Sequence, residues 1–386
     1  MHNPATNNNK GRVAVIVSND LNHDQRVLKI STTLEGLGWT PQLIGREMPG
    51  SRSLDIPFAG SRLVLPFSKG FLFYAAWQWK LLFALLRSPN EAIWANDLDT
   101  LLPAYLACKW QGIPLVYDSH EFFTEAAGLT GRPLQRGVWL VVEKWIFPRL
   151  KSVITVNNSI AEAYARRYPK SEGGKPLVVR NMPMKRTEPI ADVNWREELG
   201  IPEESIFLIL QGAYLDIDRG VVEAIEAMRL QSNWHLVVVG AGAEFEWAKT
   251  QITSLKGRLI CLPKMPFEEL CTLTASADIG LSLDRGVHVN YWFSLPNKLF
   301  DYVHAGIPVV ASPMPEVKRI VEDWHVGAVI EDHSPDSIAA AVRTVMSVDK
   351  SRWEGACREA SFALNWQAES DVIAQAMVAS GALIQA

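Results

Sequence analysis

The sequence lacks several features that would assign it to a class of protein at once. Nowhere do about 18–20 apolar residues follow one another, so we expect no transmembrane helix. The first eleven residues, MHNPATNNNKG, are polar, so we expect no secretory signal and a cytoplasmic protein. Cysteine is scarce, and the four residues stand far apart without a CxxC pair, which argues for reduced thiols rather than a disulfide frame or zinc site: Cys108, Cys261, Cys271 and Cys357.

Charge balance is also missing from each half, although the net charge of the 386 residues is only −4. Residues 1–186 carry 23 Lys and Arg against 14 Asp and Glu, a balance of +9, whereas residues 187–386 carry 15 against 28, a balance of −13. The acidic half argues against a protein that wraps nucleic acid, and we expect no nucleic-acid partner. On charge alone, the basic half is suited to an anionic membrane surface, a phosphorylated acceptor or nucleic acid.

What the sequence does contain is a regular alternation of short apolar runs and helical segments. Continuous apolar strands separated by helices predict parallel sheets that are covered on both faces. Two such series indicate two doubly wound α/β domains, joined by a proline-containing linker at 182–195. The predicted strands are 12–18, 41–45, 62–66, 92–96, 113–118, 152–157 and 176–181 in the first series, and 205–212, 234–240, 258–263, 278–283, 307–312 and 326–330 in the second.

The segment 291–312 (YWFSLPNKLFDYVHAGIPVVAS) carries the strongest chemical signal. Ser294 is the expected N-cap of a helix with Pro296 in its first turn, and Gly306 is expected to end it. A helix N-terminus beside Lys298 suits a diphosphate, and we expect this charge to meet phosphate rather than a protein carboxylate. Asp301 lies on nearly the same face and could accept ribose hydroxyls. The alternative is a surface helix whose Lys298 and Asp301 are merely solvated.

Two further candidates follow predicted strands. Arg219-Gly220 stands between strand 205–212 and a helix, where a planar guanidinium fits phosphate oxygens. The alternative is an Arg that caps a neighbouring carbonyl or pairs with Asp216 or Asp218. His120 follows strand 113–118, where it could donate to a sugar hydroxyl or serve only as a structural hydrogen-bonding group.

Two motifs are misleading. Asp97-Leu98-Asp99 imitates a metal-chelating DxD, but Asp99 is more simply a helix N-cap while Asp97 faces the cleft between the domains. The GxG of 237–246 lacks the third glycine of a dinucleotide fingerprint, since Phe245 stands there.

The segment 291–312 resembles the signature of retaining glycosyltransferases of family 4, in the subgroup with an SLPNKLFEY-like donor motif. The segments 19–39, 95–107, 116–125, 155–162, 178–183 and 211–220 agree with that family in order. The resemblance implies the GT-B fold, with two Rossmann-like domains facing a central cleft. The implied division is an acceptor-side domain at 1–184 (1–11 disordered), a donor domain at 185–362, and a C-terminal helix at 363–386 that packs back on the first domain.

The resemblance also implies roles for individual residues. His120, Arg219 and Lys298 are the expected catalytic residues. The expected donor-binding residues are Gly212, Gly220, Ser294, Leu295, Asn297 and Asp301, and the expected acceptor-side residues are Asn19, Asp97, Asp118 and Glu121.

The sequence departs from the family at two positions. Phe293 replaces the first of two usual glutamates, and Ala213 replaces a frequent arginine, so phosphate charge must come mainly from Arg219 and Lys298. The implied activity is metal- and cofactor-independent transfer from a nucleotide-diphosphate sugar to a hydroxyl acceptor, a sugar or lipid-linked, in bacterial polysaccharide or glycolipid biosynthesis. The alternatives are a nucleotide-sugar 2-epimerase of the same fold and a non-catalytic basic binding module.

Two aromatic, basic segments, 70–87 and 132–151, could place the protein peripherally on the inner face of the cytoplasmic membrane. The alternative is burial against the first sheet, which we expect for most of these side chains.

Overall fold

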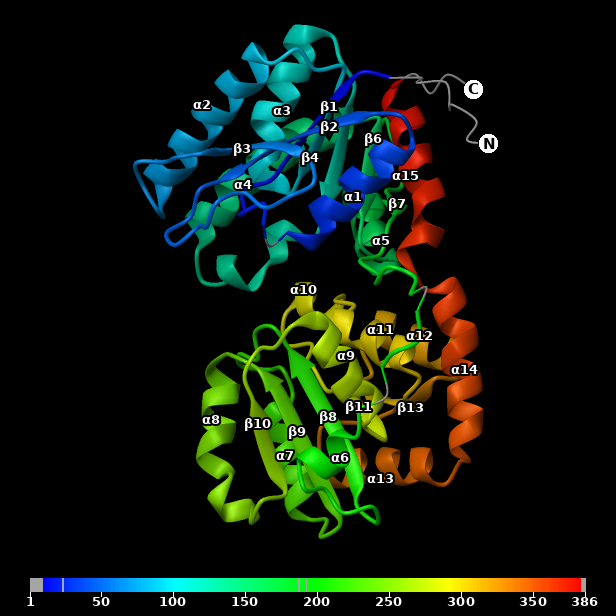
Figure 1. Ribbon diagram of the computed structural model, residues 1–386. Helices are drawn as coiled ribbons and strands as arrows, with labels where there is room; N and C mark the ends of the chain where they lie inside the picture. Colours follow the sequence, from blue (N-terminus) through cyan, green and yellow to red (C-terminus); the bar gives the residue numbers. More distant parts are fainter. Residues whose placement is uncertain (1–9, 23, 187, 192, 383–386) are drawn as a thin grey trace, which may run out of the picture. The chain divides into compact units, whose positions relative to one another are not determined.

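The computed structural model describes residues 10–22, 24–186, 188–191 and 193–382 (Figure 1). Its contacts divide the chain into an N-terminal unit, Met1–Asn181 with Glu369–Ala386, and a C-terminal unit, Met182–Ala368. Of the segment expected to be disordered, residues 1–9 lie outside the described residues. Lys10 and Gly11 contradict the expectation, because the Lys10 amide donates to Gly38 and the Thr40 amide donates to Gly11.

The N-terminal unit contains a seven-stranded parallel sheet in the order β3-β2-β1-β4-β5-β6-β7. Its strands are β1 (Arg12–Ile16), β2 (Thr40–Arg46), β3 (Ala59–Leu63), β4 (Ala92–Asn96), β5 (Leu115–Ser119), β6 (Ser152–Thr155) and β7 (Leu177–Val178). Its helices are α1 (Gln25–Gly36), α2 (Phe71–Arg87), α3 (Leu98–Gln111), α4 (Pro133–Ile146), α5 (Asn158–Arg167) and α15 (Trp366–Ser380), which belongs to this unit from Glu369 onward.

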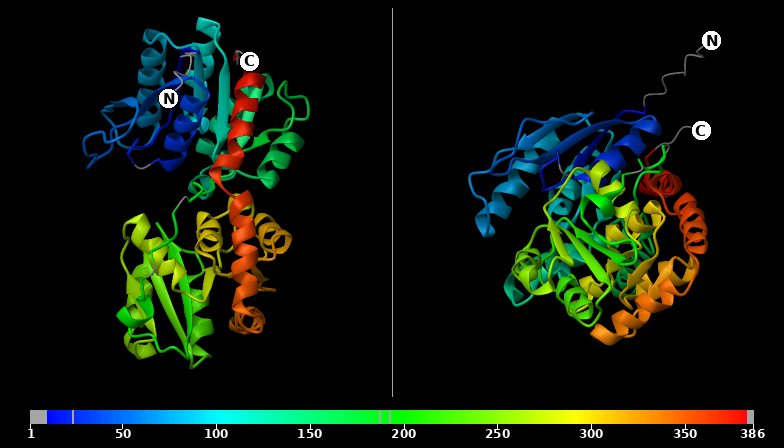
Figure 2. Two further views of the ribbon diagram at one scale, coloured as in Figure 1. Left: turned by 45° about the vertical axis from the view of Figure 1, so that its right-hand side comes forward. Right: turned by 60° about the horizontal axis from the view of Figure 1, so that its bottom comes forward.

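All seven predicted strands exist, and β3 shows where sequence reasoning fell short. It spans 59–63 rather than 62–66, because pairing with Gln42–Arg46 of β2 sets its register. As an exposed edge strand it has no apolar run to mark its start. The predicted return of the C-terminal helix is confirmed: α15 lies along the strands of this unit (Figure 2), and the Ser152 hydroxyl donates to the Ala376 carbonyl at 2.8 Å.

The C-terminal unit contains a six-stranded parallel sheet in the order β10-β9-β8-β11-β12-β13. Its strands are β8 (Ile206–Gly212), β9 (Trp234–Gly240), β10 (Leu259–Leu262), β11 (Ile279–Ser282), β12 (Val309–Ala311) and β13 (Gly327–Val329). Its helices are α6 (Trp195–Glu198), α7 (Val221–Arg229), α8 (Ala243–Gln251), α9 (Phe267–Ala275), α10 (Val289–Trp292), α11 (Asn297–Ala305), α12 (Pro315–Asp323), α13 (Pro335–Met346) and α14 (Lys350–Ala363).

Strand β8 explains why the apolar runs are continuous. Leu208 and Leu210 pack into a core with α7, α8 and α13, whereas Phe207 and Ile209 pack into a second core with α9, α11 and α12. Alternate residues of a strand point to opposite faces, so a strand covered on both faces must be apolar throughout. The prediction of doubly covered parallel sheets is therefore confirmed.

The strand orders also locate the sites. In each sheet the chain first adds strands on one side of the unit's first strand and then crosses to its other side. The strand order therefore reverses between β1 and β4 in the N-terminal unit and between β8 and β11 in the C-terminal unit. Ligands of open parallel sheets bind outside the carboxyl ends of the strands at such a switch point.

Candidate functional site

At the switch point of the C-terminal unit, two cations share one carboxylate. Arg219, in the loop after β8, places Nη1 3.1 Å from Oδ1 of Asp284, and Lys298, in the first turn of α11, places Nζ 2.9 Å from Oδ2. Asp284 follows β11, which pairs directly with β8. The carboxyl ends of two neighbouring strands thus bring together Arg219 and Asp284, which are 65 positions apart in the sequence.

This cluster retains positive charge after its internal pairing. The Lys298 and Asp284 side chains are only 8% and 4% exposed, so their attraction is weakly screened. The prediction that Lys298 would have no carboxylate partner was therefore wrong, as was the alternative pairing of Arg219 with Asp216 or Asp218. Sequence reasoning missed Asp284, although an acidic residue directly after a buried strand beside the first strand of the unit was a usable signal.

Glu244, at the start of α8, fixes the loop that carries Arg219. Its two carboxylate oxygens accept the amides of Asp218 at 3.0 Å and Val221 at 3.2 Å, on either side of Arg219-Gly220. Burial raises the pKa of Glu244, and these two backbone hydrogen bonds oppose the shift. The first N–H of α7, that of Val221, is therefore already bound by Glu244, and the same carboxylate fixes the loop that orients Arg219.

Gly220 is required at this turn. Its φ is +83°, and a Cβ there would lie 2.5 Å from the Leu283 carbonyl oxygen. No side chain could be accommodated without moving the loop after β11, which carries Asp284.

The turn before α11 differs from the prediction. The N-cap is Pro296 and the helix begins at Asn297, so Ser294 is not the cap. Ser294 instead follows Phe293, the C-cap of the short helix α10, and its amide donates to the Tyr291 carbonyl. Gly306 is the left-handed C-cap, as predicted. The buried Ser294 hydroxyl has no hydrogen-bond partner within the described part of the chain, and the same holds for Ser282 at the end of β11.

Asp301 is held from the neighbouring strand. Nε2 of Gln211, near the end of β8, donates to Oδ2 of Asp301 at 3.2 Å, and Oε1 of Gln211 accepts the Thr274 hydroxyl at 2.8 Å. This chain fixes the orientation of the Gln211 amide and so aims the Asp301 carboxylate. Gly212 ends β8, and the half-buried Leu295 precedes α11, so the predicted donor residues gather around one switch point.

In the N-terminal unit, His120 lies between two carboxylates. Its Nδ1 is 3.2 Å from Oδ2 of Asp97, and its Nε2 is 3.6 Å from Oδ2 of Asp118 and 3.0 Å from Oδ1 of Asn96. The His120 amide also donates to Oδ1 of Asp97 at 3.0 Å. About a fifth of the His120 side chain is exposed, so the ring is held by these contacts and is still partly accessible to solvent.

Asp118 is fully buried, and its carboxylate contacts Arg26 and His120. Arg26 binds it in bidentate fashion, with Nε at 3.0 Å and Nη2 at 2.8 Å, and donates from Nη1 to the Val179 carbonyl at 2.9 Å. Burial alone would raise the pKa of Asp118, but Arg26 and His120 outweigh it and lower it to about 2. Burial likewise opposes the charge on His120, but Asp97 and Asp118 outweigh it and raise the pKa of His120 to about 10. His120 is therefore a cation at neutral pH.

Asp97 contacts His120 from a strained backbone conformation. Its φ is +62°, a region rarely used by non-glycine residues, and it occupies the N-cap of α3 without a side-chain capping bond. The prediction that Asp99 is the N-cap was wrong, because Asp99 lies in the first turn, buried, where it accepts the Ser18 hydroxyl. Burial, helped by Asp97, raises the pKa of Asp99 to about 7.

The remaining acceptor-side candidates make local contacts in the loops after β1 and β5. Oδ1 of Asn19 accepts the Asp20 amide at 2.9 Å, and its Nδ2 donates to Asp24 at 3.3 Å, which shapes the loop after β1. The carbonyl of Glu121 accepts the Ser119 hydroxyl at 2.7 Å, next to His120. Among the described residues, no group of three or more His, Cys, Asp or Glu is arranged to hold a metal ion.

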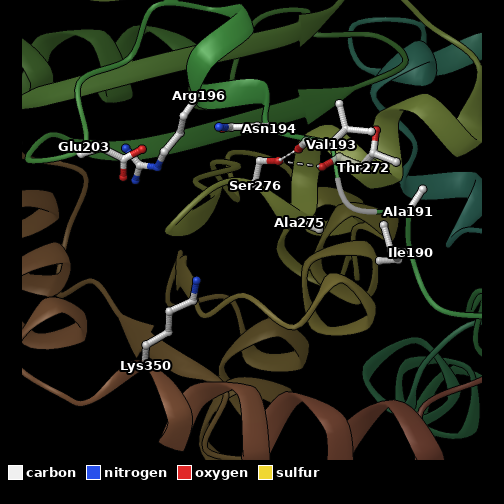
Figure 3. Close-up of a pocket in the computed structure, with 10 residues that line it drawn as sticks. All are labelled: Ile190, Ala191, Val193, Asn194, Arg196, Glu203, Thr272, Ala275, Ser276 and Lys350. Carbon is white, nitrogen blue, oxygen red and sulfur yellow. Dashed lines mark hydrogen bonds between the residues drawn. The ribbon is translucent and has the colours of Figure 1, made fainter.

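A separate pocket of about 560 Å³ lies at the amino ends of the strands of the six-stranded sheet, opposite the carboxyl ends that carry Arg219 and Asp284 (Figure 3). It is lined from α6 and the chain before it, the end of α9 and the start of α14, near the amino ends of β8 and β11. Ser276 there donates to the Val193 and Thr272 carbonyls. No predicted site residue lines this pocket, as the rule for parallel sheets leads us to expect.

Comparison with known families assigns both units. Residues 24–181 match the family described as Glycosyltransferase Family 4, and residues 192–354 match Glycosyl transferases group 1. The first match contains His120, and the second contains Arg219, Asp284 and Lys298. No curated protein sequence matches this chain.

Solved structures show the same architecture over nearly the whole length. Sucrose-phosphate synthase from Thermosynechococcus elongatus is similar with a TM-score of 0.74 and 18% identity, covering 94% of this chain and 97% of its own. Anabaena HepE in complex with UDP gives 0.73 and 14%, covering 95% and 99%. WaaG, a glycosyltransferase involved in lipopolysaccharide biosynthesis, gives 0.69 and 17%, covering 96% and 100%. With both family matches and this fold, the chain is a glycosyltransferase of the GT-B class.

Proposed function

We propose that this enzyme transfers a sugar from a nucleotide-diphosphate sugar to a hydroxyl acceptor with retention of anomeric configuration. The observation that carries the proposal is the Arg219–Asp284–Lys298 cluster, which keeps excess positive charge at the switch point of the C-terminal sheet. The unpaired, buried hydroxyls of Ser282 and Ser294 support a polar ligand there. Structures of HepE with UDP and with UDP-glucose support a nucleotide-sugar donor of this type.

In this proposal Arg219 and Lys298 bind the diphosphate, and Asp301 accepts the ribose hydroxyls. Asp284 holds both cations in place before the donor arrives, so little reorganisation is needed as negative charge develops on the leaving group. The bond between the anomeric carbon and the β-phosphate oxygen breaks, and its electron pair stays on that oxygen. The acceptor oxygen bonds to the same face of the sugar, and its proton passes to the departing diphosphate.

His120 acts from the acceptor-side unit. As a cation oriented by Asp97 and Asp118, it stabilises the developing negative charge, and it does not serve as a base. Donation to a sugar hydroxyl requires that the Nε2–H turn from Asn96 to the donor when the donor binds. The proposal requires that His120 and the C-terminal cluster contact one donor molecule during transfer. No metal or other cofactor has a role in this scheme, because Arg219 and Lys298 provide the charge stabilisation.

We place the reaction in bacterial polysaccharide or glycolipid biosynthesis, in the cytoplasm, with a sugar or lipid-linked acceptor. The similarity to WaaG supports this setting.

The first experiment is a thermal-shift screen of the full chain with nucleoside diphosphates and their sugars. A donor at a hundred times its dissociation constant should stabilise the fold by ~2.7 kcal/mol. The hit is then incubated with candidate acceptors, and NMR of the product reports the anomeric configuration. An inverted product would contradict retention, and conversion of the donor's sugar without any acceptor would indicate a 2-epimerase.

A further inference from the structure

Arg219 has a second neighbour besides Asp284. Its Cζ lies over the ring of Tyr291, 4.7 Å from the ring centroid, while its Nη1 lies 3.1 Å from Oδ1 of Asp284. Tyr291 was not among the predicted site residues, and it reaches Arg219 from the short helix α10, which follows β11. A cation within about 6 Å of the centroid of an aromatic ring is attracted by the negative potential of the ring face. Two groups of different chemistry therefore hold this one guanidinium.

The ring restrains Arg219 without taking up its hydrogen-bonding capacity. A guanidinium has several N–H donors. Within the described part of the chain, Arg219 makes one hydrogen bond, from Nη1 to Asp284. The ring attracts the cation as a whole and does not accept a conventional hydrogen bond, so the other N–H donors stay available for an anion. Because 29% of the Arg219 side chain is exposed, a ligand can reach these donors from solvent.

Tyr291 is itself held by its surroundings. In α10 the Trp292 amide donates to the His288 carbonyl at 2.7 Å, and just beyond this helix the Ser294 amide donates to the Tyr291 carbonyl at 3.0 Å. The His288 ring lies 6.0 Å from the Tyr291 ring, centroid to centroid, in an edge-to-face arrangement. Tyr291 is half-buried. The ring that meets Arg219 is therefore restrained by its own backbone and by a neighbouring ring.

The loops that carry Arg219 and Tyr291 are also joined to each other. The Arg285 amide, in the loop after β11, donates at 2.9 Å to the carbonyl of Asp218, which directly precedes Arg219 in the loop after β8. Nη1 of Arg285 lies 3.3 Å from Oε1 of Glu223 on α7. A backbone hydrogen bond and an ion pair thus connect the two loops beside the contact between Tyr291 and Arg219.

We infer that Tyr291 is a positioning residue for the donor diphosphate and that it acts through Arg219. A guanidinium held by a single hydrogen bond can still turn about that bond, and the ring contact limits this rotation. Binding of an anion then orders the Arg219 side chain less than it would without the ring, which favours affinity. The inference rests on the proposed role of Arg219 as a diphosphate ligand, and it gives Tyr291 no contact of its own with the donor.

The test is a double-mutant cycle on nucleoside-diphosphate affinity, measured by calorimetry with the full chain. The probe is whichever of UDP, GDP, ADP, CDP and dTDP binds the unsubstituted protein most tightly. Tyr291→Leu should weaken binding roughly three- to tenfold, whereas Tyr291→Phe, which keeps the ring, should stay within about twofold. Arg219→Ala should weaken binding roughly tenfold or more. When Arg219→Ala is already present, Tyr291→Leu should add less than about 1.5-fold, because no guanidinium is left to position.

Three results would overturn the inference alone and leave the proposed function intact. An equal loss from Tyr291→Leu with and without Arg219→Ala would show that Tyr291 acts independently of Arg219. Equal losses from Tyr291→Phe and Tyr291→Leu would assign the effect to the hydroxyl rather than the ring. No loss from Tyr291→Leu, while Arg219→Ala weakens binding, would show that Asp284 is enough to orient Arg219. Unchanged affinity in Arg219→Ala, or no binding of any probe, would instead overturn the proposed diphosphate site and this inference with it.

Two controls separate the ring contact from the general effect of losing an aromatic side chain. Phe83→Leu on α2 removes a ring from another cation–π pair, in which the Arg87 Cζ lies 5.9 Å from the ring centroid. It lies in the N-terminal unit and should leave the affinity unchanged, and a loss equal to that of Tyr291→Leu would also overturn the inference. Thermal denaturation reports whether Tyr291→Leu keeps the fold, and Tyr291→Met is the second non-aromatic variant if it does not.

Discussion

Both units place a charged cluster at the carboxyl ends of neighbouring strands, β4 and β5 in the N-terminal unit and β8 and β11 in the C-terminal unit, and the clusters differ in charge balance. In the C-terminal unit, Arg219 and Lys298 share the single carboxylate of Asp284. In the N-terminal unit, the cations Arg26 and His120 meet two carboxylates, Asp97 and Asp118. The first cluster therefore keeps a net positive charge that can bind an anion. In the second cluster the two carboxylates balance the two cations and hold the His120 ring in place. One arrangement suits a diphosphate, and the other suits the directed hydrogen bonding of a sugar.

Replacement of His120 by Ala should have the largest effect on turnover. Loss of a positioned donor at the reacting sugar should lower kcat by about 10²–10³ while nucleotide affinity stays within about twofold. Steady-state kinetics and nucleotide titration measure the two effects separately. His325→Asn, a surface substitution that tolerates the positive φ there, is the control. Collapse of nucleotide affinity with normal kcat would remove the distinction between the two clusters.

Lys298→Ala should have the opposite signature. A charge-assisted hydrogen bond to phosphate contributes ~1.5–3 kcal/mol, so donor affinity should fall roughly ten- to a hundredfold. Because Lys298 also pairs with buried Asp284, the free energy of unfolding should fall too, though Arg219 still compensates that carboxylate. Calorimetry and thermal denaturation measure these effects, with Lys318→Ala, at an exposed position of α12, as control. Unchanged affinity in a folded Lys298→Ala variant would exclude it from the donor site.

Asp97→Asn tests whether a carboxylate keeps His120 charged. With its pKa at about 10, His120 should hold its proton across neutrality, and activity should fall only as pH rises toward 10. Removal of the Asp97 charge lowers that pKa, so the alkaline limb should move to lower pH and kcat should fall about tenfold. The pH–rate profile is the measurement. A smaller kcat with an unmoved limb would mean that Asp97 only shapes the backbone.

The same residues make stability depend on pH. The pKa of His120 is raised, so its contribution to stability is complete below about 6.5 and is lost as pH rises through about 10. The pKa of Asp118 is lowered, so its contribution is present above about 4 and is lost as pH falls toward 2.

Glu244→Gln should have the smallest effect. A single amide oxygen cannot accept both the Asp218 and Val221 amides in the way the carboxylate does, so the loop should lose part of its restraint. Donor KM should rise several-fold while kcat changes little, because Arg219 is less well aimed. Glu246→Gln, exposed on the same helix, should leave KM unchanged. Equal kinetics for Glu244→Gln would show that Gly220 alone fixes the turn.

Residue order alone determined the alternation of elements, the two parallel sheets and the position of Lys298, Arg219 and His120 at strand or helix ends. These features depend on local periodicity, caps and turns, which neighbouring residues specify. Tertiary structure decided the partners. Asp284, Glu244 and Arg26 meet their targets because parallel strands that are distant in sequence are adjacent in the sheet. It also decided which aromatic side chains of α2 and α4 face solvent, since an apolar helix reveals its buried side only once it packs on a sheet.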